Sequence, residues 1–265
     1  MTLVTRTIFS LPQLLAELAI LGVVVAALVG VHALLQRRFT SEMLRRHNDV
    51  AGYLFSAVGV LYAVVLGFVV VVVWQKYDVS VSNVENEVNA VGDLYHDVDG
   101  VSEPARSEIR SDLRRYVVLV RNVEWPEMAR GQSVPVDGAQ LLDDAFYRVN
   151  TFAPRDFQQF AAQQASIQAA QRLVDARRSR LVVSVPAVPV VLWFALIAGA
   201  LAMVAFCYIF GVENRPAQLM MTAILVGLIG ILFVVIQAFS TPFAGSVRIS
   251  DDGWAYLQHR LPTIK

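Results

Sequence analysis

The residues best suited to act on ions lie in two short turns between long apolar segments. In the first turn, residues 36–49, basic side chains stand next to an amide and an acid: Arg37, Arg38, Arg45, Arg46, His47, Asn48 and Asp49. The second turn, residues 211–216, carries Glu213 and Asn214. Rings of such side chains at the mouth of a pore select ions by the sign of their charge. The alternative is that the arginines only set orientation, because short arginine-rich loops stay in the cytoplasm.

Other kinds of chemistry have little support. The sequence has no glycine-rich phosphate loop, no paired cysteines or histidines at metal-ligand spacing, and no nucleophile motif. Its four histidines are scattered over different segments: His32, His47, His96 and His259. The 22 basic and 22 acidic residues balance, so no excess of positive charge would attract nucleic acid. We therefore expect no enzymatic activity, no metal, no cofactor and no nucleic-acid partner.

Four segments are long and apolar enough to cross a membrane, which takes about 20 residues. They are residues 11–35, 50–74, 186–210 and 217–239, in a chain that is 56% hydrophobic and 17% charged. Glu17 is the only acidic residue inside a predicted span. Such an acid either has a function or lies near enough to the interface to reach water. We expect a multi-pass membrane protein with the lipid bilayer as its solvent.

The connections between the spans predict the topology. Each hairpin returns the chain, so both polar turns lie on one side of the membrane, and the termini and residues 75–185 lie on the other. Arginines occur on both sides, but most of the basic residues opposite the turns belong to the long insertion, where the positive-inside rule is weak. The charges therefore favour turns inside the cell and the insertion outside.

The insertion is predicted to be helical, which makes the fold class all-α. Apolar residues recur at steps of three and four from Val81 to Tyr95, so the second span should continue beyond the membrane as an amphipathic helix. Further helices are expected after Pro104, ending near Trp125 and Pro126, then around residues 141–149, and from residue 157 into the third span. The predicted parts are residues 11–74 and 186–239 as two membrane helix pairs, 75–185 as the soluble insertion and 240–265 as a C-terminal tail.

Small residues follow one another along the second span at three- or four-residue steps: Gly52, Ser56, Gly59, Ala63 and Gly67. Small side chains let membrane helices approach closely. The stripe either packs within one subunit or faces a neighbouring subunit or a pore. Part of this stripe, together with the hydroxyl of Tyr62 and four turn residues, supplies the candidates for a pore or gate. They are Asn48, Asp49, Ser56, Gly59, Tyr62, Ala63, Glu213 and Asn214.

Several ordered motifs resemble the bacterial membrane family named for its bestrophin-like domain. They are residues 47–52 (HNDVAG), 58–64 (VGVLYAV), 124–128 (EWPEM), 175–178 (DARR), 210–214 (FGVEN) and 242–245 (PFAG). The resemblance implies four spans, a helical insertion after the second, a homo-oligomer and a bacterial inner membrane. Bestrophins themselves are pentameric anion channels whose second helices line the pore, and they hold the insertion in the cytosol, opposite to the charge-based orientation.

The resemblance does not extend to the pore itself. A bestrophin neck has large apolar side chains at one-turn spacing, and the comparable positions here are Phe55, Gly59 and Ala63, or Leu61, Val65 and Val69. Neither set reproduces an aromatic neck, and the cytosolic tail and calcium clasp of animal bestrophins have no counterpart. The leading hypothesis is an oligomeric ion channel that passes inorganic ions. The alternative is a membrane sensor or scaffold whose helical insertion binds a ligand or partner protein.

Overall fold

The computed structural model describes residues 7–38, 48–184 and 188–261. Its contacts divide the chain into two units. The apolar unit contains residues 9–75 and 186–240, and the polar unit contains residues 76–185 together with both terminal segments. Helix α3 (Asn48–Asp97) contributes to both, because it runs unbroken from the second predicted span into the insertion, as its periodicity predicted.

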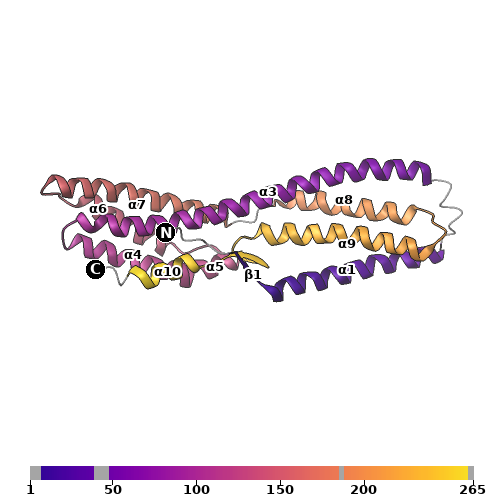
Figure 1. The fold of residues 1–265 in the computed structure, drawn as a ribbon, viewed down its shortest axis with the longest axis horizontal. Coiled ribbons are helices and arrows are strands. Elements are labelled where there is room, and N and C mark those ends of the chain that lie inside the picture. The colour runs from indigo at the N-terminus through magenta and orange to yellow at the C-terminus, as the bar shows by residue number, and fades with distance from the viewer. Residues whose placement is uncertain (1–6, 39–47, 185–187, 262–265) are drawn as a thin grey trace. The chain divides into compact units, whose positions relative to one another are not determined.

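The apolar unit consists of α1 (Leu11–Arg38), the first part of α3, α8 (Val190–Ile209) and α9 (Arg215–Ser240). All four helices are long and apolar enough to cross a membrane, which confirms the four predicted spans at the level of length and composition. Within the unit α1 packs on α9 and α9 on α8, with α3 on the other side of α8 (Figure 1).

The core of the apolar unit joins three of its helices. Leu66, Val69 and Val73 of α3 are buried against Leu196 of α8 and Ile236 of α9. Outside that core, large apolar side chains face outward over the whole unit, for example Phe68 at 68% and Val191 at 76% exposure. Water would oppose so much exposed apolar surface, whereas lipid or another copy of the chain covers it at no such cost.

The polar unit is built from shorter helices. Its elements are η1 (Val98–Gly100), α4 (Ala105–Leu119), the π-helical turn η2 (Val120–Glu124), α5 (Trp125–Ala129), α6 (Asp137–Thr151), α7 (Phe157–Val183) and α10 (Asp252–Arg260). Strands β1 (Thr7–Phe9) and β2 (Val247–Ile249) pair as a small two-stranded sheet. Buried residues of α4 and α6 form much of the core, among them Ile109, Leu113, Tyr116, Leu142 and Val149.

Two features differ from the sequence-based expectations. The helix that begins after Pro104 does not stop near Pro126, because η2 leads directly into α5 and the helical path reaches Ala129. Pro126 occupies the first turn of α5, where the missing N–H is tolerated. Residues 241–261, set apart above as part of a tail, belong to the polar unit and supply the buried Trp254 to its core.

Candidate functional site

Asn48 connects the two polar turns at one end of the apolar unit. Its Nδ2 donates a hydrogen bond to the Gly211 carbonyl oxygen at 2.8 Å, and its Oδ1 accepts one from the Gly211 amide at 3.0 Å. The side chain therefore satisfies both backbone polar groups of one residue, as a neighbouring strand would. The start of α3 is thereby attached to the residue that follows α8.

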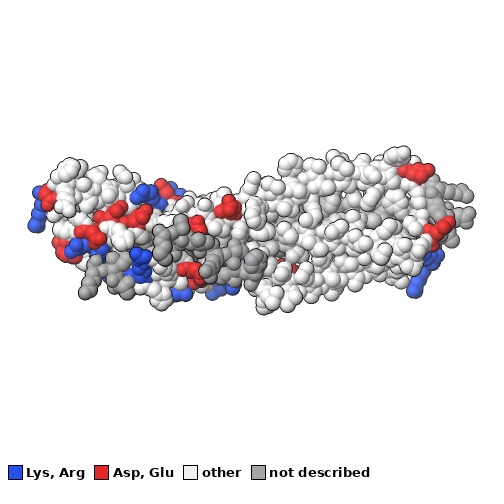
Figure 2. Space-filling model, viewed as in Figure 1, with Lys and Arg blue, Asp and Glu red and all other residues white. Residues whose placement is uncertain are grey.

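The other turn candidates have different surroundings. Asn214 caps α9, since its Oδ1 accepts a hydrogen bond from the Ala217 amide at 3.2 Å. Asp49 lies in the first turn of α3, where the helix dipole favours an acid. Asp49 and Glu213 are both exposed, and Figure 2 shows charged side chains gathered at this end of the apolar unit. Arg45, Arg46 and His47 lie outside the described residues.

The α3 candidates divide between two faces of the helix. A Cβ at Gly59 would lie 3.3 Å from Cε of Met203, so this glycine faces α8. The Tyr62 ring packs beside Gly199 of α8 so closely that a Cβ there would overlap it. This half of the small-residue stripe thus packs within the subunit.

Ser56 and Ala63 lie on the neighbouring face of α3, turned away from α8, and are exposed. The Ser56 hydroxyl donates to the Gly52 carbonyl of its own helix at 2.9 Å. A Cβ added at Gly67 would meet nothing within 4 Å. We call Ser56, Val60, Ala63 and Gly67 the outer face of α3. All four residues of this face are exposed within the chain.

A polar cluster joins α1, α8 and α9 near the turns. His32, only 1% exposed, has its Nδ1 2.9 Å from the Thr222 hydroxyl. Gln36 donates to the Gln218 side chain at 2.9 Å, and Gln218 donates in turn to the Phe210 carbonyl at 2.5 Å. No local sequence pattern indicates this pairing, because 190 residues separate His32 from Thr222.

A second polar cluster, which we call the ion network, is buried in the polar unit. Arg180 donates from Nε to Oε2 of Glu87 at 2.5 Å and from Nη2 to the carboxylate of Glu124. Arg177 donates from Nη2 to Oε1 of Glu124 at 2.7 Å. Glu87, Glu124 and Arg180 are fully buried and Arg177 nearly so. The two acids and two bases balance, which a water-free site requires.

Tyr116 completes the ion network. Its hydroxyl donates to Glu87, and burial together with the Glu87 charge raises the tyrosine pKa well above its ordinary value. Burial opposes the charged form of Arg180, but the adjacent Glu87 carboxylate outweighs it and raises the pKa of Arg180. Tyr116 therefore stays neutral and Arg180 charged over the physiological pH range.

Local backbone features position the ion network. The π-helical turn η2 ends at Glu124, and such turns in α-helices are often found at functional sites. A Cβ at Gly138, at the start of α6, would overlap Oε1 of Glu124 and lie 3.0 Å from Nη2 of Arg177. Only glycine therefore fits this approach. The network joins α3, α4, η2 and α7, and the start of α6 closes over it.

The sequence motifs noted above meet in pairs in the structure. Glu124 and Arg177 come from the EWPEM and DARR motifs, and Asn48 and Gly211 from HNDVAG and FGVEN. Trp125 stacks edge-on against Phe243 of PFAG, with ring centroids 5.2 Å apart. The motifs gave no indication of this pairing, and Glu87 and Arg180 lie largely outside them.

This architecture is that of a known class of helical membrane proteins. A bacterial bestrophin homologue from Klebsiella pneumoniae, solved with zinc phasing, matches with a TM-score of 0.60 at 12% identity, over 90% of this chain and 97% of the other. Two mutant forms described as the same kind of homologue give TM-scores of 0.61 and 0.65 at 13% and 10% identity, over 90% of this chain and 98% and 99% of theirs. At these identities the likeness shows the fold.

The family is identified from the sequence. The family model described as the Bestrophin-like domain matches residues 22–253, so the chain belongs to the Bestrophin-like family, as the ordered motifs suggested. No curated protein matches the sequence.

Proposed function

We propose that the chain is a subunit of an oligomeric ion channel in a bacterial inner membrane, with the α3 helices of several copies around the axis. The observation that supports this most is the uncovered outer face of α3. Ser56, Ala63 and Gly67 are small or polar and are exposed within the chain, and a Cβ added at Gly67 would meet nothing within 4 Å. Lipid gains little from such a surface, whereas a neighbouring helix or a file of hydrated ions fits against it.

The turn end supports the same proposal. Asp49 and Glu213 are exposed beside a rigid link between α3 and the residue after α8. In a symmetric oligomer each copy would repeat these acids around the mouth of the pore. The polar unit would then stand outside the membrane on the opposite side and form a vestibule. In this role the protein lets ions pass through the membrane and catalyses no reaction.

The experiment uses purified full-length protein in a planar bilayer under a salt gradient. The chain has one cysteine, Cys207, so a Cys207→Ser background allows a thiol to be placed at will. A charged thiol reagent should change the current of Ser56→Cys, on the outer face, and leave Gly59→Cys, which faces α8, largely unchanged. A monomer in mild detergent, or no current from a folded oligomer, would contradict the proposal.

A second candidate function is a membrane sensor or scaffold. It is favoured by the course of α3, which continues from the apolar unit into the polar unit and there carries Glu87 of the ion network. An event at the polar unit would reach the membrane along a single helix. A folded protein that never conducts but binds a ligand or partner through residues 76–184 would favour this function.

A further inference from the structure

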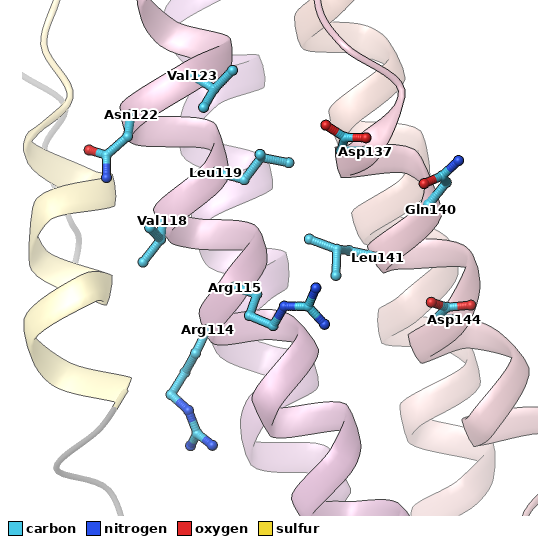
Figure 3. Close-up of a pocket in the computed structure, with 10 residues that line it drawn as sticks. All are labelled: Arg114, Arg115, Val118, Leu119, Asn122, Val123, Asp137, Gln140, Leu141 and Asp144. Atoms are coloured by element: carbon cyan, nitrogen blue, oxygen red, sulfur yellow. The ribbon is translucent and has the colours of Figure 1, made fainter.

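A groove on the surface of the polar unit combines an apolar floor with walls of opposite charge. It has a volume of about 780 Å³ and lies along α4, η2 and α6, within the range of about 300–1,000 Å³ usual for ligand pockets. Leu119 and Leu141 lie between the two helical walls, and Val123 extends the apolar floor (Figure 3).

The α4 wall provides the positive charge. Arg115 reaches from α4 toward α6 in Figure 3, and its side chain is 69% exposed. Its one ion pair with a described residue is weak, because Nη1 lies 3.6 Å from Asp112, and Asp112 is already held by Arg148 at 2.6 Å. Most of the donors on the Arg115 guanidinium therefore remain available to an anionic group in the groove.

The α6 wall provides the negative charge. Asp137, Gln140 and Asp144 follow one another along α6 at steps of three and four, so they share a face of the helix. Among the described residues neither aspartate forms an ion pair. Two carboxylates and an amide oxygen thus face a guanidinium across an apolar floor.

We propose that this groove binds a short apolar peptide with both ends charged. A carboxylate would lie at Arg115, an ammonium group at Asp137 or Asp144, and the apolar side chains on Leu119, Val123 and Leu141. A single amino acid carries both charges on groups attached to one carbon. A peptide of two or three residues separates them. The site does not depend on conduction, and it names a ligand class for the sensor function described above.

The test measures binding by calorimetry with the full-length protein in detergent. The three probes are leucyl-leucine, its C-terminal amide and its N-acetylated form. Leucyl-leucine should bind tightest, and loss of either terminal charge should weaken binding by about fivefold, the scale of a largely exposed ion pair. In Arg115→Gln, leucyl-leucine and its amide should bind equally, while acetylation still weakens binding. In the double variant Asp137→Asn, Asp144→Asn, leucyl-leucine and its N-acetylated form should bind equally, while amidation still weakens binding.

Arg178→Gln is the matched control, because Arg178 is 75% exposed and also has a weak ion pair three residues away, at 3.8 Å from Asp175. It should leave all three affinities unchanged. Thermal unfolding of each variant identifies any that fails to fold, and Arg115→Lys then keeps the charge for a second comparison. Equal affinity for the three probes in the wild type would mean apolar adsorption only and would overturn the proposal. No binding of leucyl-leucine by the folded wild-type protein would overturn it as well, whether or not the protein conducts.

Discussion

The side chain of Asn48 forms two hydrogen bonds with the backbone N–H and C=O of Gly211, at 3.0 and 2.8 Å. The two residues stand 163 positions apart, at the start of α3 and just after α8. Because Gly211 is buried, water cannot readily replace the amide side chain. The link fixes the geometry of the end at which Asp49 and Glu213 are exposed.

Asn48→Ala should therefore destabilise the apolar unit by about 1–3 kcal/mol, the cost of leaving buried backbone groups without partners. Thermal unfolding in detergent measures this. Asp49→Asn, at the next position, is the control and should change stability little. Equal effects of the two substitutions would show that Asn48 contributes no more than its exposed neighbour.

Gly59→Leu and Ala63→Leu should have different effects, although the residues are one turn apart. Leucine at position 59 would be forced against Met203, which costs about 1–3 kcal/mol in a packed interior. Leucine at position 63 meets no such contact within the subunit and should disturb only contacts between copies. Unfolding and size-exclusion chromatography separate the two effects. If both variants still assemble, the outer face loses its support as a subunit interface.

Arg180→Leu should destabilise the polar unit strongly, by about 3–5 kcal/mol, because it leaves Glu87 buried without its cation and Glu124 with Arg177 alone. The double change Glu87→Gln and Arg180→Leu removes the stranded Glu87 charge and keeps the Arg177–Glu124 ion pair, so it should recover part of the loss. Arg178→Gln, on the exposed side of α7, is the control. Chemical unfolding measures all three variants. A tolerated Arg180→Leu would contradict the ion network as drawn.

Tyr116 should make stability fall at alkaline pH. Its pKa is raised by burial and by Glu87, so the folded protein keeps the proton while the unfolded chain loses it near the ordinary value of 10.0. Its contribution is fully present below that pH and is lost as pH rises toward the folded pKa. Tyr116→Phe should flatten the decline between about pH 9 and pH 11 relative to the wild type. Tyr147→Phe, which replaces an exposed tyrosine, should leave the decline as it is in the wild type.

The acids at the turn end should influence ion selectivity if this end is the mouth of the pore. Asp49→Asn with Glu213→Gln should move the reversal potential under a salt gradient toward anion preference. Arg45→Gln with Arg46→Gln should move it the other way. Both shifts should shrink in 1 M salt, where the screening length is about 3 Å. Unchanged selectivity in conducting variants would place the filter elsewhere, and lower expression of the arginine variants alone would indicate a role in orientation.

The sequence by itself determined the local architecture. Runs of about 20 apolar residues and three- to four-residue periodicity are properties of neighbouring positions, so they predicted the four apolar helices and the extension of α3. The prediction that Pro126 ends a helix was wrong. Proline is tolerated in the first turn of a helix and stops a helix elsewhere, and only the position at which α5 begins decides between the two.

The tertiary structure alone decided which residues meet. A small residue on α3 has the same local signature on either face, and only the position of α8 assigns Gly59 inward and leaves Ala63 outward. Glu87 and Arg180 each look like solvated charges on an amphipathic helix, and 93 residues separate them. They pair because the packing of α3 on α7 removes water from both, and a buried charge needs an opposite charge within reach. That requirement concerns neighbours in space, which no local sequence pattern records.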